Sequence, residues 1–140
     1  MPDTQRSSIT GSKELAGLRK TALANSTLHL FKEGLTPSVN TPLADFVAVE
    51  ADYTTYAAKT IVAWNDPSLA SVAGYNLTAP LETYLLAATP ATPNVIGGWF
   101  LVLADGATLI DFGTFDPPRP MQVADQAIQL VPSEFFPAGV

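Results

Sequence analysis

The chain has 140 residues, 47% of them apolar and 14% charged, with 12 prolines, 9 glycines and a net charge of −6, a composition that favours one domain of short strands and turns over long helices. Because it has no cysteine and one histidine, disulfides, thiolate metal sites and sites that need two imidazoles are excluded. No apolar run approaches the roughly 18 residues of a membrane span, so we expect no membrane partner.

Residues 1–24 are predicted to form an N-terminal arm, extended or in a short helix. The first residues are polar and without periodicity, and a helix over residues 12–24 places Leu15 and Leu18 on one face. The first 20 residues carry a net charge of +2, whereas residues 33–140 carry −9. Such an arm would lie on an acidic surface, either a neighbouring subunit or nucleic acid, or remain solvated. We expect the rest of the chain to fold without it.

Apolar residues alternate with polar ones from Ser26 onward, and turn residues separate these runs. The expected strands outside the central hairpin span residues 26–32, 46–50, 53–64, 71–78, 81–88 and 127–131. Three prolines within residues 115–120 forbid a ladder there and indicate an extended edge or crossover. About eight short strands are typical of a sandwich. We therefore predict an all-β fold, a single antiparallel β-sandwich over residues 25–132 with the jelly roll as one form of it, followed by a C-terminal tail over residues 133–140.

The central hairpin is expected to turn at Asp105-Gly106, because residues of this type accept the positive φ angles of a tight turn. A two-residue turn sets Val102 opposite Leu109, Leu101 opposite Ile110 and Trp99 opposite Phe112. One face then carries Trp99, Leu101, Leu103, Ile110 and Phe112, and the other carries Phe100, Val102 and Leu109 beside Asp111. Because both faces are apolar, we expect the second to be covered by a tail, a loop or another subunit.

Several motifs, taken in order, resemble those of small virion proteins of tailed bacteriophages. They are Thr27-Leu28-His29-Leu30-Phe31-Lys32 with Pro37 a few residues on, Ala44-Asp45-Phe46, Tyr53-Thr54-Thr55-Tyr56-Ala57, Gly97-Gly98-Trp99-Phe100-Leu101-Val102, and Phe115-Asp116-Pro117-Pro118 before Met121. The resemblance covers about residues 22–132. It implies a structural role in a virion and carries over no catalytic residue.

Side chains that could do chemistry also have structural interpretations. His29 stands between two leucines of an alternating strand and is expected to point outward. Glu50 with Asp52, and Asp111 with Asp116, could bind Ca²⁺ or act as a glycosidase pair, although acids at strand ends more often solubilise an edge. Large aromatic residues could form a sugar-stacking platform but more often fill a sandwich core. They are Tyr53, Tyr56, Trp64, Tyr75, Tyr84 and Trp99.

The sequence thus predicts a non-enzymatic structural protein of a bacteriophage particle, a capsid decoration protein or another small virion component. We expect it to form a homo-oligomer and to bind other virion proteins, with no catalytic residue, cofactor, metal or nucleic acid partner. The alternative is a carbohydrate- or receptor-binding module of a phage tail or fibre, and a small hydrolase ranks last. The expected assembly interface comprises Arg6, Lys13, Leu15, Leu18, Arg19, Lys20, Phe100, Val102 and Leu109.

Overall fold

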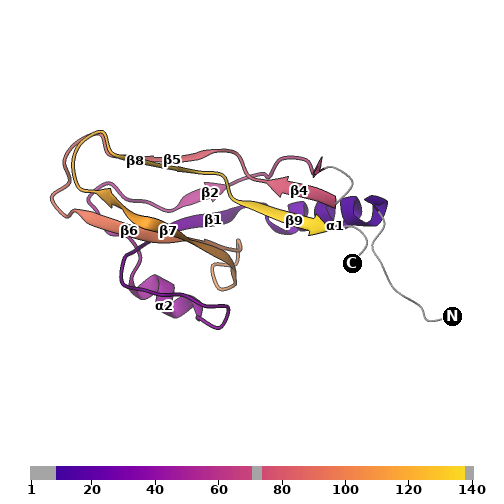
Figure 1. The fold of residues 1–140 in the computed structure, drawn as a ribbon, viewed down its shortest axis with the longest axis horizontal. Helices are drawn as coiled ribbons and strands as arrows, with labels where there is room; N and C mark the ends of the chain where they lie inside the picture. The colour runs from indigo at the N-terminus through magenta and orange to yellow at the C-terminus, as the bar shows by residue number, and fades with distance from the viewer. Residues whose placement is uncertain (1–8, 71–73, 138–140) are drawn as a thin grey trace. The chain divides into compact units, whose positions relative to one another are not determined.

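The computed structural model describes residues 9–70 and 74–137 and has mostly β structure (Figure 1). Strands make up 43% of it and helices 14%, so the fold is all-β and sandwich-like, as the sequence predicts. The helices are α1 (Ile9–Ala22) and α2 (Leu43–Ala48). The strands are β1 (Ser26–Lys32), β2 (Lys59–Ile61), β3 (Ser68–Leu69), β4 (Gly74–Thr78), β5 (Glu82–Leu85), β6 (Asn94–Val102), β7 (Leu109–Met121), β8 (Ala127–Leu130) and β9 (Ser133–Pro137).

The chain divides into two compact units. Unit 1 combines residues 1–24, 61–81 and 131–140, and unit 2 combines residues 25–60 and 82–130. In unit 1, β4 pairs with β3 on one side and with β9 on the other. Most of the segment expected as a C-terminal tail is therefore a strand. The described residues of the predicted arm and tail, 9–24 and 133–137, belong to the same compact unit.

Helix α1 packs against β4 and β9. Its residue Ala16 is fully buried, and so is Leu23 just after the helix, whereas Leu15 and Leu18 are 50% and 71% exposed. A helix of 14 residues is marginal in isolation, so these strands hold it in place. The apolar stripe of Leu15 and Leu18 that their spacing predicts therefore faces solvent. Ala16, whose side chain is small, makes the close contact with the strands instead.

The main sheet of unit 2 has the strand order β2-β1-β6-β7. Strand β1 has the bounds predicted from its alternation, with Leu28 and Leu30 fully buried. Figure 1 shows β5 and β8 on one side of this sheet and α2 on the other. On the first side, Tyr84 of β5 is buried and donates its hydroxyl to Leu28 O at 2.8 Å. Of the strand expected over residues 53–64, only residues 59–61 form one.

A short helix replaces the strand expected over residues 46–50. Pro42 occupies its N-cap position and Asp45 lies in its first turn, where a negative charge suits the helix dipole. Six residues cannot sustain a helix alone, so tertiary packing decides its structure. The ring of Phe46 is fully buried and packs on three rings of the sheet. Their centroids lie 5.4 Å away for Phe31, 5.2 Å for Phe100 and 5.4 Å for Phe112.

The β6–β7 hairpin has a bulge that the sequence did not predict. The observed pairs are Val102 with Leu109, Leu101 with Asp111, Phe100 with Phe112 and Trp99 with Gly113. The first pair is as predicted, but one extra residue on β7 then shifts the register. A slip by one residue moves side chains to the opposite face. Phe112 therefore lies beside Phe100 on the sheet face that α2 covers. The sequence had predicted it on the opposite face, paired with Trp99.

The turn of this hairpin is also wider than predicted. Leu103 N donates to Thr108 O at 2.9 Å, which leaves a four-residue loop where two residues were expected. Gly106 has the expected positive φ, at 72°. The carboxylate of Asp105 accepts hydrogen bonds from the backbone N–H groups of Ala107 and Thr108 at 2.8 and 3.0 Å. These bonds hold the loop and lower the pKa of Asp105.

Phe100, Val102 and Leu109, expected in an assembly interface, are covered by their own chain. Phe100 is 0% and Val102 3% exposed, and Leu109 packs against the same cluster beneath α2. The apolar face did need cover, and a helix between two loops supplies it. This part of the predicted interface is corrected for Phe100 and Val102, which are not accessible to a second subunit, whereas Leu109 is only partly buried.

Candidate functional site

A polar cluster surrounds Glu50, just after α2. Thr27 Oγ1 lies 2.8 Å from His29 Nε2, and His29 Nδ1 lies 2.7 Å from Glu50 Oε2. Because a carboxylate only accepts, Nδ1 donates to it, and Nε2, when it carries no proton, accepts from the Thr27 hydroxyl. Tyr56 donates its hydroxyl to the same Glu50 oxygen at 2.6 Å. Burial raises the pKa of Glu50, but the hydrogen bonds from His29 and Tyr56 outweigh burial and hold it below its ordinary value of 4.5.

This hydroxyl–imidazole–carboxylate series has the hydrogen bonds of a catalytic triad, but its surroundings favour a structural role. A triad also needs a substrate site beside the nucleophile and N–H donors for the oxyanion. The His29 ring instead stacks on Phe100, with centroids 4.6 Å apart, and none of the cluster residues lines the pocket described below. The cluster ties β1 to the segment after α2. His29 was expected to point outward, and in the structure it is largely covered, with 18% of its side chain exposed.

Of the two carboxylate pairs predicted as Ca²⁺ or glycosidase sites, Glu50, Asp52 and Asp111 each have hydrogen-bond partners of their own. Asp52 accepts hydrogen bonds from Asn94 at 2.8 Å and from Lys32 at 3.2 Å, and these bonds lower its pKa. Asp111 accepts from the backbone N–H of Phe112 at 2.8 Å. Within residues 9–70 and 74–137 no three acidic or histidine side chains gather as metal ligands do.

The last carboxylate of these pairs, Asp116, lies in a second irregular part of β7. Thr114 stands opposite Gly98 and Arg119 opposite Ile96, so the four residues 115–118 face a single residue of β6. The prolines expected to forbid a ladder interrupt the pairing of β6 with β7 over residues 115–118, and the pairing resumes at Arg119. An edge strand tolerates this because its outer N–H groups need no partner in the sheet. The peptide bond between Asp116 and Pro117 is cis.

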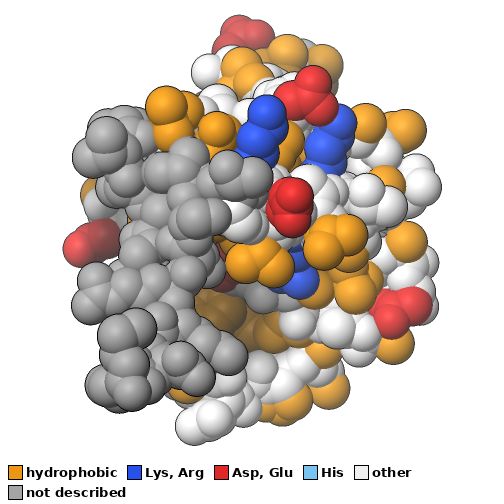
Figure 2. Space-filling view, turned by 90° about the vertical axis from the view of Figure 1, so that its right-hand side faces the viewer, with side chains coloured by type: hydrophobic (Ala, Val, Ile, Leu, Met, Phe, Trp, Pro, Cys, Tyr) orange, Lys and Arg blue, Asp and Glu red, His pale blue; other side chains and the backbone are white. Residues whose placement is uncertain are grey.

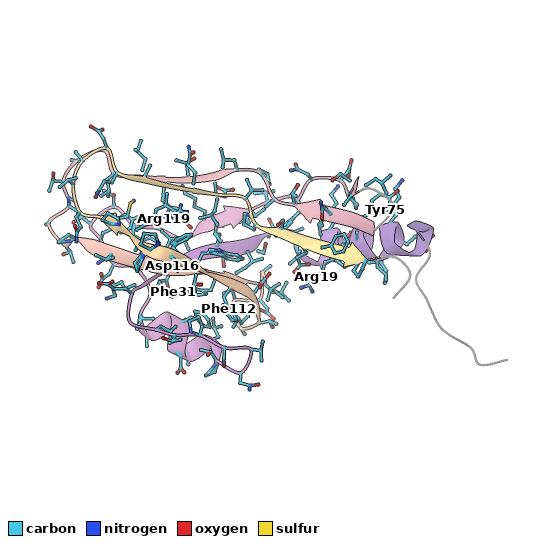
Figure 3. All side chains as sticks on the ribbon, viewed as in Figure 1. Arg19, Phe31, Tyr75, Phe112, Asp116 and Arg119 are labelled. Atoms are coloured by element: carbon cyan, nitrogen blue, oxygen red, sulfur yellow. The ribbon has the colours of Figure 1, made fainter. Side chains whose placement is uncertain are left out.

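This irregular stretch forms one wall of a pocket of about 420 Å³. Residues 33–37, which follow β1, form the other wall, and Gly97 of β6 lies between them. Glu33 N donates to Val95 O at 2.9 Å, which fixes the start of this segment against β6. The chain then turns at Gly34, whose φ of 107° favours glycine. All lining residues belong to unit 2, and Figure 3 labels Asp116 and, just beyond the bulge, Arg119.

The charged arm residues expected in an assembly interface bind acidic groups of their own unit. Arg19 Nε and Nη2 donate to the two carboxylate oxygens of Glu134 at 2.9 and 3.0 Å. Lys20 donates to Asp66 at 2.5 Å, and this hydrogen bond, with the positive charges of Lys20 and Lys13, lowers the pKa of Asp66. Lys13 is exposed. Arg6 lies outside the described residues.

The aromatic residues weighed as a sugar-stacking platform lie mostly inside the protein. Tyr53, Trp64 and Tyr84 are 3%, 2% and 3% exposed, so they cannot present a ring face to a ligand. Tyr56 stacks on Tyr84 with centroids 6.1 Å apart. Phe115 lines the pocket described above, and the sequence analysis did not single it out as a binding residue.

A sequence signal for this pocket existed in the motifs of the phage resemblance. Half of the ten lining residues stand in those motifs, namely Pro37, Gly97, Phe115, Asp116 and Pro118. They are far apart in the chain, and the pairing of β6 with both β1 and β7 brings them together. Nothing local in the sequence indicates that they meet.

No model of a known protein family matches the chain, and comparison with curated proteins and with solved structures finds no match. In the described part of the chain, no helix combines the length and apolar character needed to cross a membrane.

Proposed function

We propose that the protein is a non-enzymatic structural component of a bacteriophage particle, a capsid decoration protein or another small virion protein that assembles as a homo-oligomer. The distribution of exposed apolar side chains carries this proposal. Of the eleven large hydrophobic side chains exposed in the described residues, seven belong to unit 1, the smaller unit. They are Leu15, Leu18, Val62, Leu69, Leu81, Val131 and Phe135.

Single exposed apolar residues are ordinary, but their concentration on one part of a protein is typical of an attachment surface. Figure 2 looks onto the side where Figure 1 draws α1, and hydrophobic side chains are exposed there between charged ones. Leu15 and Leu18 therefore keep the assembly role proposed for the arm. Its paired cations, Arg19 and Lys20, lose that role because their charges are neutralised within unit 1.

The charge of the two units supports the same arrangement. Unit 1 has four acidic and four basic residues, a net charge of zero, whereas unit 2 has nine acidic and three basic residues, a net charge of −6. Neutral apolar surfaces of two copies can meet without electrostatic cost, whereas acidic surfaces repel one another. Unit 1 would therefore supply the surface that attaches the protein to its neighbours.

Sedimentation velocity of the purified protein tests this proposal. Replacing Leu15 and Leu18 together by serine should lower the oligomer mass, while the control Val39→Ser, at a side chain 93% exposed in unit 2, should not. Because the contact is apolar, raising the salt concentration should leave the wild-type oligomer intact. A monomeric wild type, or loss of the oligomer in salt alone, would count against it. Detecting the protein in purified phage particles by mass spectrometry tests the virion assignment.

The pocket of unit 2 favours a second candidate, a carbohydrate- or receptor-binding module of a phage tail or fibre. A concave site with convergent polar groups and an apolar wall is the usual form of a small-molecule site. Its volume of about 420 Å³ falls in the range of about 300–1,000 Å³ found for such sites. Direct binding to the free protein tests this candidate.

A further inference from the structure

The polar side chains of the unit 2 pocket are unpartnered within the described residues. Four of its lining residues have polar side chains, namely Glu33, Thr36, Thr114 and Asp116. None of these four has a hydrogen bond or ion pair within residues 9–70 and 74–137. Their oxygens are therefore available to a ligand. Two carboxylates supply only acceptors, and two hydroxyls supply both donors and acceptors.

The remaining wall of the pocket is apolar. It includes the ring of Phe115 with Pro37 and Pro118. The guanidinium carbon of Arg119 lies 4.3 Å from the centroid of the Phe115 ring, but Arg119 is not a lining residue. Arg119 thus holds the ring from outside the pocket, and its positive charge already interacts with the π-system.

We infer that this pocket binds the ring of a neutral hexopyranose, such as the terminal residue of a glycan, an inference that rests on the second function proposed above. Sugar hydroxyls donate to carboxylates in charge-assisted hydrogen bonds, and threonine hydroxyls pair with the remaining hydroxyls. The C–H face of a pyranose packs on an aromatic ring or on proline. The pocket supplies each of these groups within one concave site.

Charged ligands fit the same groups less well. An anion would meet Glu33 and Asp116 in a unit of net charge −6. A cation would pair with the carboxylates, but beside the Phe115 ring it would lie close to the positive charge of Arg119, whose guanidinium carbon is 4.3 Å from the ring centroid. A neutral polyhydroxylated ring uses all four polar side chains.

The test is an NMR titration of the ¹⁵N-labelled full chain with the methyl glycosides of glucose, galactose, mannose and N-acetylglucosamine. Glucuronate and butylamine serve as the anionic and cationic comparison ligands. At least one neutral glycoside should shift the amide signals of Gly34, Gly97 and Thr114. Glu33→Gln and Asp116→Asn should each weaken binding about tenfold or more, since each removes a charged hydrogen-bond acceptor. Glu14→Gln, at an exposed carboxylate of α1, is the control and should bind as the wild type does.

The spectra also show whether each variant is folded, so a loss of binding can be assigned to the pocket. Binding of butylamine or glucuronate without any glycoside would overturn the inference, and so would glycoside binding that both pocket variants retain. The absence of any shift would overturn it as well. Each of these outcomes leaves the assembly proposal standing, because assembly is measured by sedimentation and depends on unit 1.

Discussion

Replacing Phe46 by alanine should detach α2 from the main sheet of unit 2. Phe46 is fully buried and is the residue through which this six-residue helix reaches the rings of Phe31, Phe100 and Phe112. A helix of this length has no stability of its own. Its position therefore depends mainly on that side chain, with Leu43 of the same helix packed in part against the same cluster, and loss of the ring should expose the face that contains Phe100.

The expected loss of unfolding free energy is about 3–5 kcal/mol, the usual cost of truncating a fully buried phenylalanine. This is a large fraction of the roughly 5–15 kcal/mol that stabilises an ordinary domain. With a urea dependence of about 2 kcal/mol per molar, the unfolding midpoint should fall by about 1.5–2.5 M. Phe46→Leu should have a smaller effect because leucine refills part of the space.

Urea unfolding followed by circular dichroism measures the midpoint, and binding of a hydrophobic dye reports exposure of the sheet face. The matched control is Val47→Ala on the same helix, at a side chain 53% exposed; it should change stability by no more than about 0.5 kcal/mol. Equal shifts for Phe46→Ala and Val47→Ala would refute the reasoning. In that case α2 would not cover the sheet, and Phe100 would again be a candidate interface residue.

Three further predictions concern polar groups. Glu50→Gln should destabilise the protein at neutral pH and progressively less below pH 4.5. The pKa of Glu50 in the folded state lies below its ordinary value of 4.5. The ionised carboxylate therefore stabilises the fold above pH 4.5, and this stabilisation is lost as the pH falls through the folded-state pKa. The difference in urea midpoint between the wild type and Glu50→Gln should therefore shrink as the pH falls. A difference that stays constant with pH would contradict this prediction. Burial raises the pKa of three of the four tyrosines above the ordinary 10.0, so they should ionise only as the protein unfolds in alkali, and tyrosinate absorbance from more than one tyrosine before unfolding would contradict this. They are Tyr53, Tyr56 and Tyr84. Arg19→Ala and Glu134→Ala should be non-additive in a double-mutant cycle, with a coupling of about 0.5–1 kcal/mol for this bidentate pair, and strict additivity would show that the ion pair stabilises nothing.

Local patterns of the sequence were sufficient for the elements that form through local physics. The alternation of β1 predicted its bounds over residues 26–32, because a strand with one buried face repeats every two residues. Asp105 and Gly106 predicted the position of a hairpin turn, since few residues accept a positive φ. A short helix before β1 was also predicted, although its buried side, marked by Ala16, was not. The all-β fold follows from these patterns and from the many prolines and glycines.

Tertiary structure alone decided the features that bear on function, such as the pocket and the exposed surfaces. A bulge on β7 turned Phe112 toward α2, and the burial of Phe46 made a helix where the pattern predicted a strand. Arg19 finds Glu134 across 115 residues of sequence, so the charge of the arm is neutralised within its own unit. The pocket likewise joins residues 33–37 to residues 114–118. Such contacts depend on packing and electrostatic energies between segments distant in the chain, and a local sequence pattern does not contain those energies.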